Sequence, residues 1–65
     1  NLSLLKGYIK QLKPHYQQVI NLRYFQDLSY KEMAEILNEP MSNIKVKLLR
    51  AKKILSEIIL ANESK

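Results

Sequence analysis

The chain has 65 residues, a formal net charge of +5, one histidine and no cysteine. Its length allows one small domain that buries only ~60% of its unfolded surface, and its composition leads us to expect no disulfide, metal site or other cofactor. No apolar stretch approaches the ~20 residues that cross a bilayer, and the amino-terminal apolar residues are too interrupted for a signal peptide, so we expect a soluble, cytoplasmic protein without a membrane partner.

The first half of the chain is expected to form two helices. Apolar residues at helical spacing predict the first from about Ser3 to Leu12. Pro14 favours the first turn of a second helix, which we expect to run to about Tyr24 or Phe25. Val19 and Leu22 are its expected buried positions, with Tyr16, Ile20 and Phe25 as further candidates.

A third helix is indicated by its capping residues. Ser29 can cap its start, because Glu32 three residues later completes a capping box. Asn38 can adopt the left-handed conformation that often ends a helix, and Pro40 prevents its continuation. We expect the apolar stripe of this helix to be Met33, Ala34, Ile36 and Leu37.

The last helix is expected to begin with Ser42 or Asn43 as its cap, and no breaker follows. At ~100° per residue, one side gathers apolar residues and should pack on the domain: Ile44, Leu48, Ala51, Leu55 and Ile58. Further apolar residues near the end exceed what one packing face needs, so we expect part of this tail to contact another protein. The tail comprises Ile54, Leu55, Ile58, Ile59 and Leu60.

These elements predict an all-α fold. No strand-like alternation, repeat or internal domain boundary is present, so residues 1–65 should form one four-helix domain. A helix-turn-helix would span about residues 29–55, without a wing. The small side chain of Ala34 permits a close crossing of the last two helices.

Positive charge is concentrated in the last helix. Residues 41–55 contain no acid, and their formal charge of +5 equals that of the whole chain. The basic residues are Lys45, Lys47, Arg50, Lys52 and Lys53. Such segregation favours a polyanionic partner, most simply nucleic acid. The alternative is a solvated lysine-rich face.

The side of this helix opposite its packing face mixes cations with short polar and aliphatic residues. It carries Ser42, Asn43, Val46, Leu49, Arg50 and Lys53, with Lys45 and Lys47 on its flanks. Short polar groups can hydrogen-bond base edges, aliphatic groups can contact thymine methyls, and arginine can bind guanine through two hydrogen bonds. The pattern therefore indicates a base-reading face, although Leu49 could instead pack on a partner protein.

The start of the third helix offers candidate phosphate contacts. Ser29, Tyr30 and Lys31 lie where backbone amides and the helix dipole favour an anion. The alternative for Tyr30 is a half-buried packing residue.

Other polar residues do not indicate an enzyme. His15 is expected to be exposed, with no nucleophile or acid–base pair around it. The carboxylates of the third helix are interpreted as a solvated face, and Arg23 could pair with one of them. They are Glu32, Glu35 and Glu39.

The order of residues resembles region four, the C-terminal promoter-recognition domain of bacterial RNA polymerase sigma factors, and especially the extracytoplasmic-function type. The resemblance runs from Leu12 to Leu55 and includes Gln17-Gln18-Val19 and Arg50-Ala51-Lys52. Its specific part runs from Leu22 to Leu37, LRYFQDLSYKEMAEIL. Departures concern which DNA sequence is read: Ser42-Asn43 replaces the usual Gly-Thr, and Val46 replaces a small polar residue.

The resemblance implies that the last helix reads the minus-thirty-five promoter element from the major groove. It places Asn43, Lys45, Val46, Leu49 and Arg50 at base edges and Tyr30, Lys31, Lys47 and Lys53 near phosphates. Ser29 and Ser42, each at the start of a helix, are further phosphate candidates. The implied partners are promoter DNA, the flap of the polymerase beta subunit and a possible anti-sigma factor, with no small-molecule substrate. Because a core-binding domain is absent, we do not expect this chain to initiate transcription alone.

Two other functions remain open. A LuxR-type response-regulator output domain shares the helix-turn-helix, although the string from Leu22 to Phe25 and the basic run Arg50-Ala51-Lys52-Lys53 favour a sigma factor. A sigma-like module could also act only through protein partners. Salt-dependent DNA binding separates the last possibility from the others.

Overall fold

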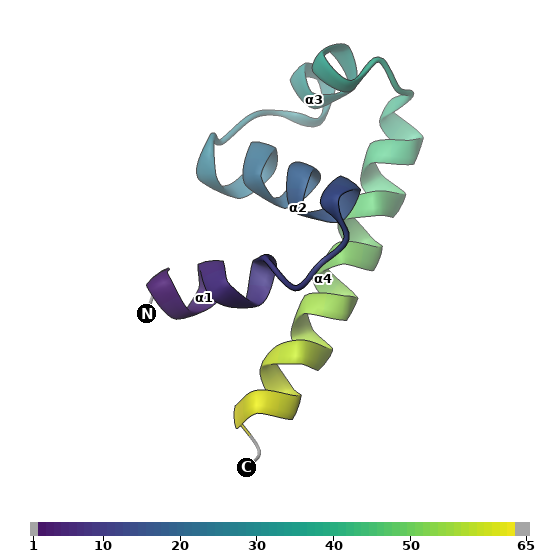
Figure 1. Cartoon of the computed structure of the whole chain (residues 1–65). Coiled ribbons are helices and arrows are strands. Elements are labelled where there is room, and N and C mark those ends of the chain that lie inside the picture. The colour runs from purple at the N-terminus through teal and green to yellow at the C-terminus, as the bar shows by residue number, and fades with distance from the viewer. Residues whose placement is uncertain (1, 64–65) are drawn as a thin grey trace.

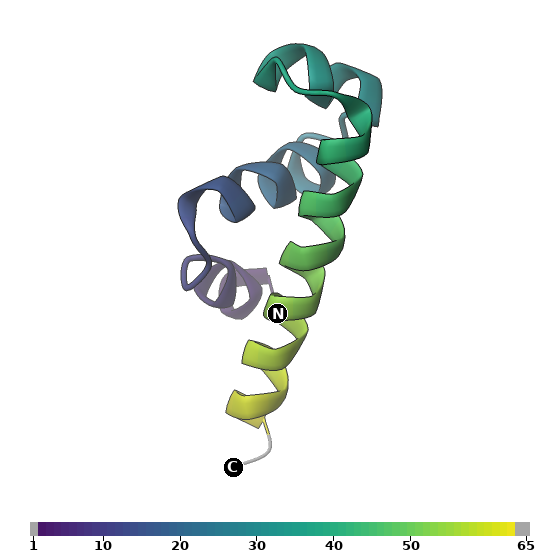
Figure 2. The same ribbon diagram turned by 90° about the vertical axis from the view of Figure 1, so that its right-hand side faces the viewer.

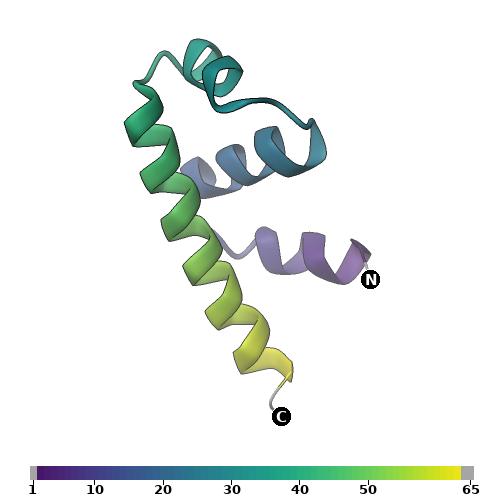
Figure 3. The ribbon, with the colours of Figure 1, turned by 180° about the vertical axis from the view of Figure 1, so that it is seen from behind.

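The computed structural model describes residues 2–63, and within them the chain forms four α-helices and one short π-helix, with no strand. Their bounds are α1 Leu2–Ile9, α2 Pro14–Ile20, η1 Asn21–Phe25, α3 Tyr30–Leu37 and α4 Met41–Glu63. The long helix α4 runs along one side of the molecule, and the three shorter α-helices all lie against the same side of it (Figures 1, 2 and 3). The predicted all-α, four-helix class is confirmed.

Helix α1 ends earlier than predicted. It stops at Ile9 rather than near Leu12, and the next residues close a tighter turn in which the Leu12 amide donates to the Ile9 carbonyl at 3.0 Å. Lys13 is extended, with φ −62° and ψ 150°. Because the residue before a proline avoids helical geometry, the chain has to leave α1 before it reaches Pro14.

The second predicted helix has the expected extent but an unexpected end. It continues without a break from α2 into η1. In η1 backbone hydrogen bonding joins residues five positions apart, as in a π-helix: the Gln26 amide donates to the Asn21 carbonyl at 3.0 Å. Asp27 then takes a left-handed conformation, with φ 55°. Together these features turn the chain toward α3.

The caps of α3 are confirmed. The Glu32 amide donates to the Ser29 hydroxyl oxygen at 3.1 Å, and the Ser29 amide donates to the Glu32 carboxylate at 2.9 Å. Asn38 is left-handed, with φ 54° and ψ 47°. The short turn that follows leads directly into α4.

The predicted cap of α4 is wrong. The helix begins at Met41, ahead of Ser42 and Asn43. The Pro40 carbonyl accepts from the amides of Asn43 at 3.0 Å and Ile44 at 3.2 Å. The first turn is therefore closed from Pro40, whose fixed φ suits a helix start.

The core lies between α4 and the shorter helices. It comprises Ile9, Leu12, Val19, Ile20, Leu22, Met33, Ile44, Leu48 and Ala51. Partly buried residues pack against it, among them Tyr16, Ala34, Leu37, Leu55 and Ile58. The expected buried positions of the second and last helices are thus confirmed, apart from Phe25.

Phe25 and Ile36 are exposed, contrary to expectation. Phe25 is 39% exposed, and its ring lies 5.6 Å from the Lys6 ammonium at the surface. Ile36 is 59% exposed. Because α3 is short and packs through the narrow stripe of Met33, Ala34 and Leu37, Ile36 falls outside the contact.

The carboxyl-terminal half of α4 extends past α1 (Figure 3). Leu60 is 65% exposed and Ile54 36% exposed, whereas Leu55 and Ile58 still touch the core. Contact of this tail with another protein stays a prediction. None of the helices within residues 2–63 has both the length and the apolar character needed to cross a membrane.

Candidate nucleic-acid interface

The predicted base-reading residues share one exposed face of α4. Its opposite side is anchored, because Ile44 and Ala51 are fully buried. The face therefore has a fixed orientation on the domain. It comprises Asn43, Lys45, Val46, Leu49 and Arg50, with Ser42 and Lys53 also exposed. Asn43, Val46, Lys47 and Arg50 line a shallow depression on it.

Two apolar residues on this face are accessible to a ligand. Leu49 is 70% exposed and Val46 is 44% exposed. They are available for contact with base methyl groups or with a protein.

Lys47 differs from the other lysines of α4. It is half-buried, and its ammonium lies 2.6 Å from the Glu39 carboxylate in the turn between α3 and α4. Its charge is thus already compensated within the protein. The pair joins residues on either side of the α4 start, and sequence reasoning did not anticipate it.

The predicted phosphate residues at the start of α3 are in different states. Lys31 is exposed, whereas both the amide and the side chain of Ser29 are engaged with Glu32. Hydrogen bonds with Ser29 lower the pKa of the Glu32 carboxyl below its ordinary value of 4.5. The bond from the Ser29 amide has the larger effect and the bond with the Ser29 side chain the smaller one. Ser29 therefore acts first as a cap.

Tyr30 is half-buried and lies between two cations. The Arg23 guanidinium is 5.3 Å and the Lys45 ammonium 5.7 Å from the centre of its ring. These distances are within the range of cation–π attraction. The ring therefore links η1 to α4, which agrees with the packing interpretation of Tyr30 and leaves its phosphate role a prediction.

Arg23 does not form the ion pair with Glu32, Glu35 or Glu39 that the sequence allowed. Its Nη1 donates to the Leu28 carbonyl at 3.1 Å. Its nearest ion pair, at 3.9 Å, is with Asp27, whose side chain is 98% exposed. Because η1 turns the guanidinium toward the loop before α3, the carbonyl is the closer partner.

A second tyrosine–lysine contact lies beside the first, and sequence reasoning missed it. The Lys52 ammonium is 5.3 Å from the centre of the Tyr24 ring, and Tyr24 is 50% exposed. A side-chain hydrogen bond with Tyr24 raises the pKa of Lys52 above its ordinary value of 10.5. The available signal was the spacing of Lys45 and Lys52, which lie two helical turns apart on one side of α4.

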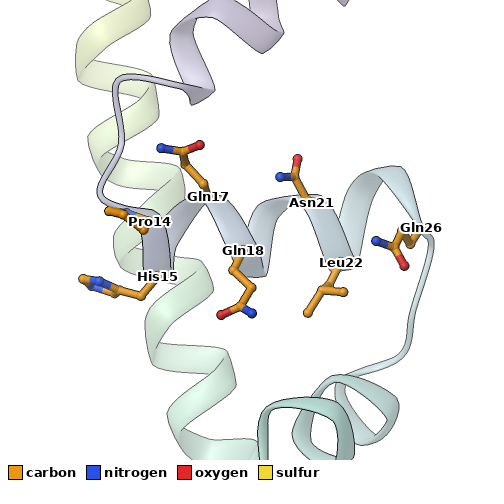
Figure 4. Close-up of a pocket in the computed structure, with 7 residues that line it drawn as sticks. All are labelled: Pro14, His15, Gln17, Gln18, Asn21, Leu22 and Gln26. Carbon is orange, nitrogen blue, oxygen red and sulfur yellow. The ribbon is translucent and has the colours of Figure 1, made fainter.

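A separate shallow hollow runs along α2 and η1. Gln17 and Asn21 point toward α1, whereas Gln18 and Leu22 point toward α3 (Figure 4). Its remaining lining residues are Pro14, His15 and Gln26. His15 is exposed as predicted. The lining is thus mainly amide side chains. Gln17 already donates to the Leu12 carbonyl at 2.7 Å, whereas Gln18, Asn21 and Gln26 are exposed and can hydrogen-bond to a partner surface.

A short capped helix crossing a long basic helix, with an exposed mixed face on the latter, defines a helix-turn-helix domain of the DNA-binding class. Comparison with protein families identifies its family. Residues 2–55 match the family model "Sigma-70, region 4". The chain therefore belongs to the sigma-70 region 4 family. This family consists of non-enzymatic, DNA-binding regulators.

Individual relatives are sigma factors of Bacillus subtilis (strain 168). The chain is 34% identical over 56 residues to the ECF RNA polymerase sigma factor SigM, covering 86% of this chain and 34% of SigM. It is 44% identical over 48 residues to RNA polymerase sigma factor YlaC, covering 74% of this chain and 28% of YlaC. For RNA polymerase sigma factor SigV the identity is 38% over 47 residues, covering 72% and 28% of the two chains.

The chain thus spans about a third of the length of these curated relatives. No solved structure matches it.

Proposed function

We propose that this domain recognises the minus-thirty-five element of promoters, as part of a cytoplasmic sigma factor that directs RNA polymerase in transcription initiation. The observation that carries the proposal is the exposed face of α4, where Asn43 and Arg50 stand beside Val46 and Leu49. A buried opposite side holds this face rigid. Rigid display of polar and aliphatic side chains is what reading base edges in the major groove requires.

The contacts divide into two kinds. Asn43 and Arg50 can hydrogen-bond bases, while Val46 and Leu49 can contact thymine methyl groups. Lys31 and Lys53 are exposed beside this face and are suited to phosphates, which position a protein without reading sequence. Ser42 also lies exposed in the first turn of α4 and can donate its hydroxyl hydrogen to a phosphate.

Protein partners complete the proposal. A surface other than the reading face would bind the flap of the polymerase beta subunit, and an anti-sigma factor could occlude the domain. The exposed tail residues Leu60 and Ile54 support the presence of a protein contact on α4. Burial of an exposed leucine contributes about 1.5–3 kcal/mol to such a contact.

A module that acts only through proteins is the second candidate. The 70% exposure of Leu49 favours it, because the same side chain could fill a pocket on a protein partner. Under this function Arg50 and Asn43 would not select bases.

Selection of bound sequences from a random DNA pool, with the domain tethered to RNA polymerase, tests the proposal. We expect the selected sequences to share one enriched motif, which would correspond to the minus-thirty-five element. An Asn43→Ala, Arg50→Ala double variant should lose that motif, whereas Lys10→Ala, at an exposed position outside the face, should retain it. Enrichment of the same motif by the double variant would contradict base reading and favour the protein-only function.

A further inference from the structure

We propose that Arg23, Tyr24, Tyr30, Lys45 and Lys52 form a phosphate-binding cluster on the side of α4 that faces η1. We call these residues the tyrosine–cation cluster. The inference rests on the proposed DNA binding and deepens it. It adds Arg23, Tyr24 and Lys52 to the DNA-contacting residues, and it assigns Lys45 to the backbone rather than to a base edge.

The cluster is built from two adjacent contacts between rings and cations. Tyr30 lies between Arg23 and Lys45, at 5.3 Å and 5.7 Å, and Tyr24 lies 5.3 Å from Lys52. Arg23 and Tyr24 both belong to η1, and Lys45 and Lys52 lie on one side of α4, so the two contacts form between the same two elements. The rings restrict the cations while leaving most of their N–H groups available to oxygen atoms.

The charge of the cluster is not compensated by its own members. Three cations are gathered with two neutral phenols, and within residues 2–63 the one carboxylate paired with the cluster is the almost fully exposed Asp27, 3.9 Å from Arg23. Like charges held together repel each other, so an anion with several oxygen atoms would stabilise the arrangement. Phosphate is suited to this, and tyrosine hydroxyls and lysine ammonium groups both bind it in protein–DNA complexes.

The position of the cluster matches a DNA backbone beside a helix in the major groove. Lys45 and Lys52 lie about 100° around α4 from the centre of the reading face, and about 10 Å apart along its axis. This separation allows the two lysines to contact different phosphates of one strand.

The opposite flank of α4 is different. It carries Lys47, whose charge is compensated by Glu39, and the apolar Ile54. A helix in the major groove has a sugar–phosphate backbone on either side of it. Lys45 and Lys52 on one flank have no carboxylate partner among the described residues, whereas Lys47 on the other flank has one. We therefore expect the flank that carries the tyrosine–cation cluster to make the stronger contact with the DNA backbone.

The salt dependence of binding tests the cluster. The chain would be titrated with a labelled DNA duplex of fixed sequence over a series of salt concentrations. Removing one phosphate-binding cation should make the slope of log K against log salt shallower by ~0.9. We expect this change for Lys52→Ala and not for Lys10→Ala, which removes the same charge from an exposed site outside the cluster.

Tyr24 provides a test of positioning that loss of charge cannot mimic. Tyr24→Leu should weaken DNA binding about twofold to tenfold, because Lys52 loses the ring that restricts it. Tyr24→Phe retains the ring and loses only the hydroxyl, so it should restore part of the affinity. Because Tyr24 and its partner Lys52 are both exposed, neither substitution should disturb the fold. The helical circular dichroism signal of each variant should therefore match that of the parent chain.

The outcomes separate the cluster from the proposed function. If the parent chain showed no affinity for the duplex at low salt, both the proposed DNA binding and the tyrosine–cation cluster would be overturned. Binding by the parent chain with identical slopes for Lys52→Ala and Lys10→Ala would overturn the cluster alone, as would equal affinities of Tyr24→Leu and the parent chain.

Discussion

Arg50 and Lys53 lie three residues apart on α4, yet their expected roles in DNA binding differ. Arg50 lines the depression on the reading face with Asn43 and Val46, whereas Lys53 is exposed outside it. Arg50→Ala should relax specificity at one base position and cost ~1–3 kcal/mol, while Lys53→Ala should weaken all sequences alike. Binding to a set of singly substituted duplexes measures both effects. Uniform losses for Arg50→Ala would contradict its base-reading role.

Glu32 makes the stability of the domain dependent on acid pH. Its pKa is lowered in the folded state, so its carboxylate stabilises the fold above pH 4.5, and this contribution is lost as the pH falls through the folded-state pKa. Thermal unfolding midpoints of the parent chain and Glu32→Gln, measured from neutral pH down to pH 3, should therefore converge as the solution becomes acidic. A constant difference across this range would show that ionisation of Glu32 does not contribute.

At the scale of elements, the turn between α3 and α4 restrains a lysine that could otherwise bind DNA. Glu39 compensates Lys47 at 2.6 Å. Glu39→Gln should raise DNA affinity and steepen its salt dependence, because Lys47 becomes available to a phosphate and a negative charge is removed. Glu35→Gln is the matched control, since it removes the same charge from an exposed position on α3. Equal gains for both variants would indicate only a general charge effect.

At the scale of the whole molecule, the fold depends on a few buried side chains because the chain is short. Met33 is fully buried and joins α3 to the core, whereas Ile36 on the same helix is 59% exposed. Met33→Ala should cost ~2–5 kcal/mol of unfolding free energy, and Ile36→Ala should change it by no more than ~0.5 kcal/mol. Chemical denaturation of both variants compares the two positions. A similar loss at Ile36 would contradict the packing of α3 described above.

Much of the fold could be predicted from the sequence because its signals are local. The Ser29–Glu32 capping box and the left-handed Asn38 depend on residues within one or two helical turns. The buried side of α4 follows from spacing along one helix, which also predicted the exposed face that carries the candidate site. The specific run from Leu22 to Leu37 was sufficient to indicate the sigma-factor family, which the family match confirmed.

Only the tertiary structure decided how separate elements meet. The exposure of Ile36 depends on how narrow the contact between α3 and α4 is, and the partner of Arg23 depends on the π-helical turn of η1. The Tyr24–Lys52 contact joins residues 28 positions apart, which no helical period relates. The sequence by itself therefore determined the helices, their caps and the composition of the reading face, because these arise within single elements. Packing between elements decided which side chains these flanking cations contact: Tyr30 for Lys45, Tyr24 for Lys52 and Glu39 for Lys47.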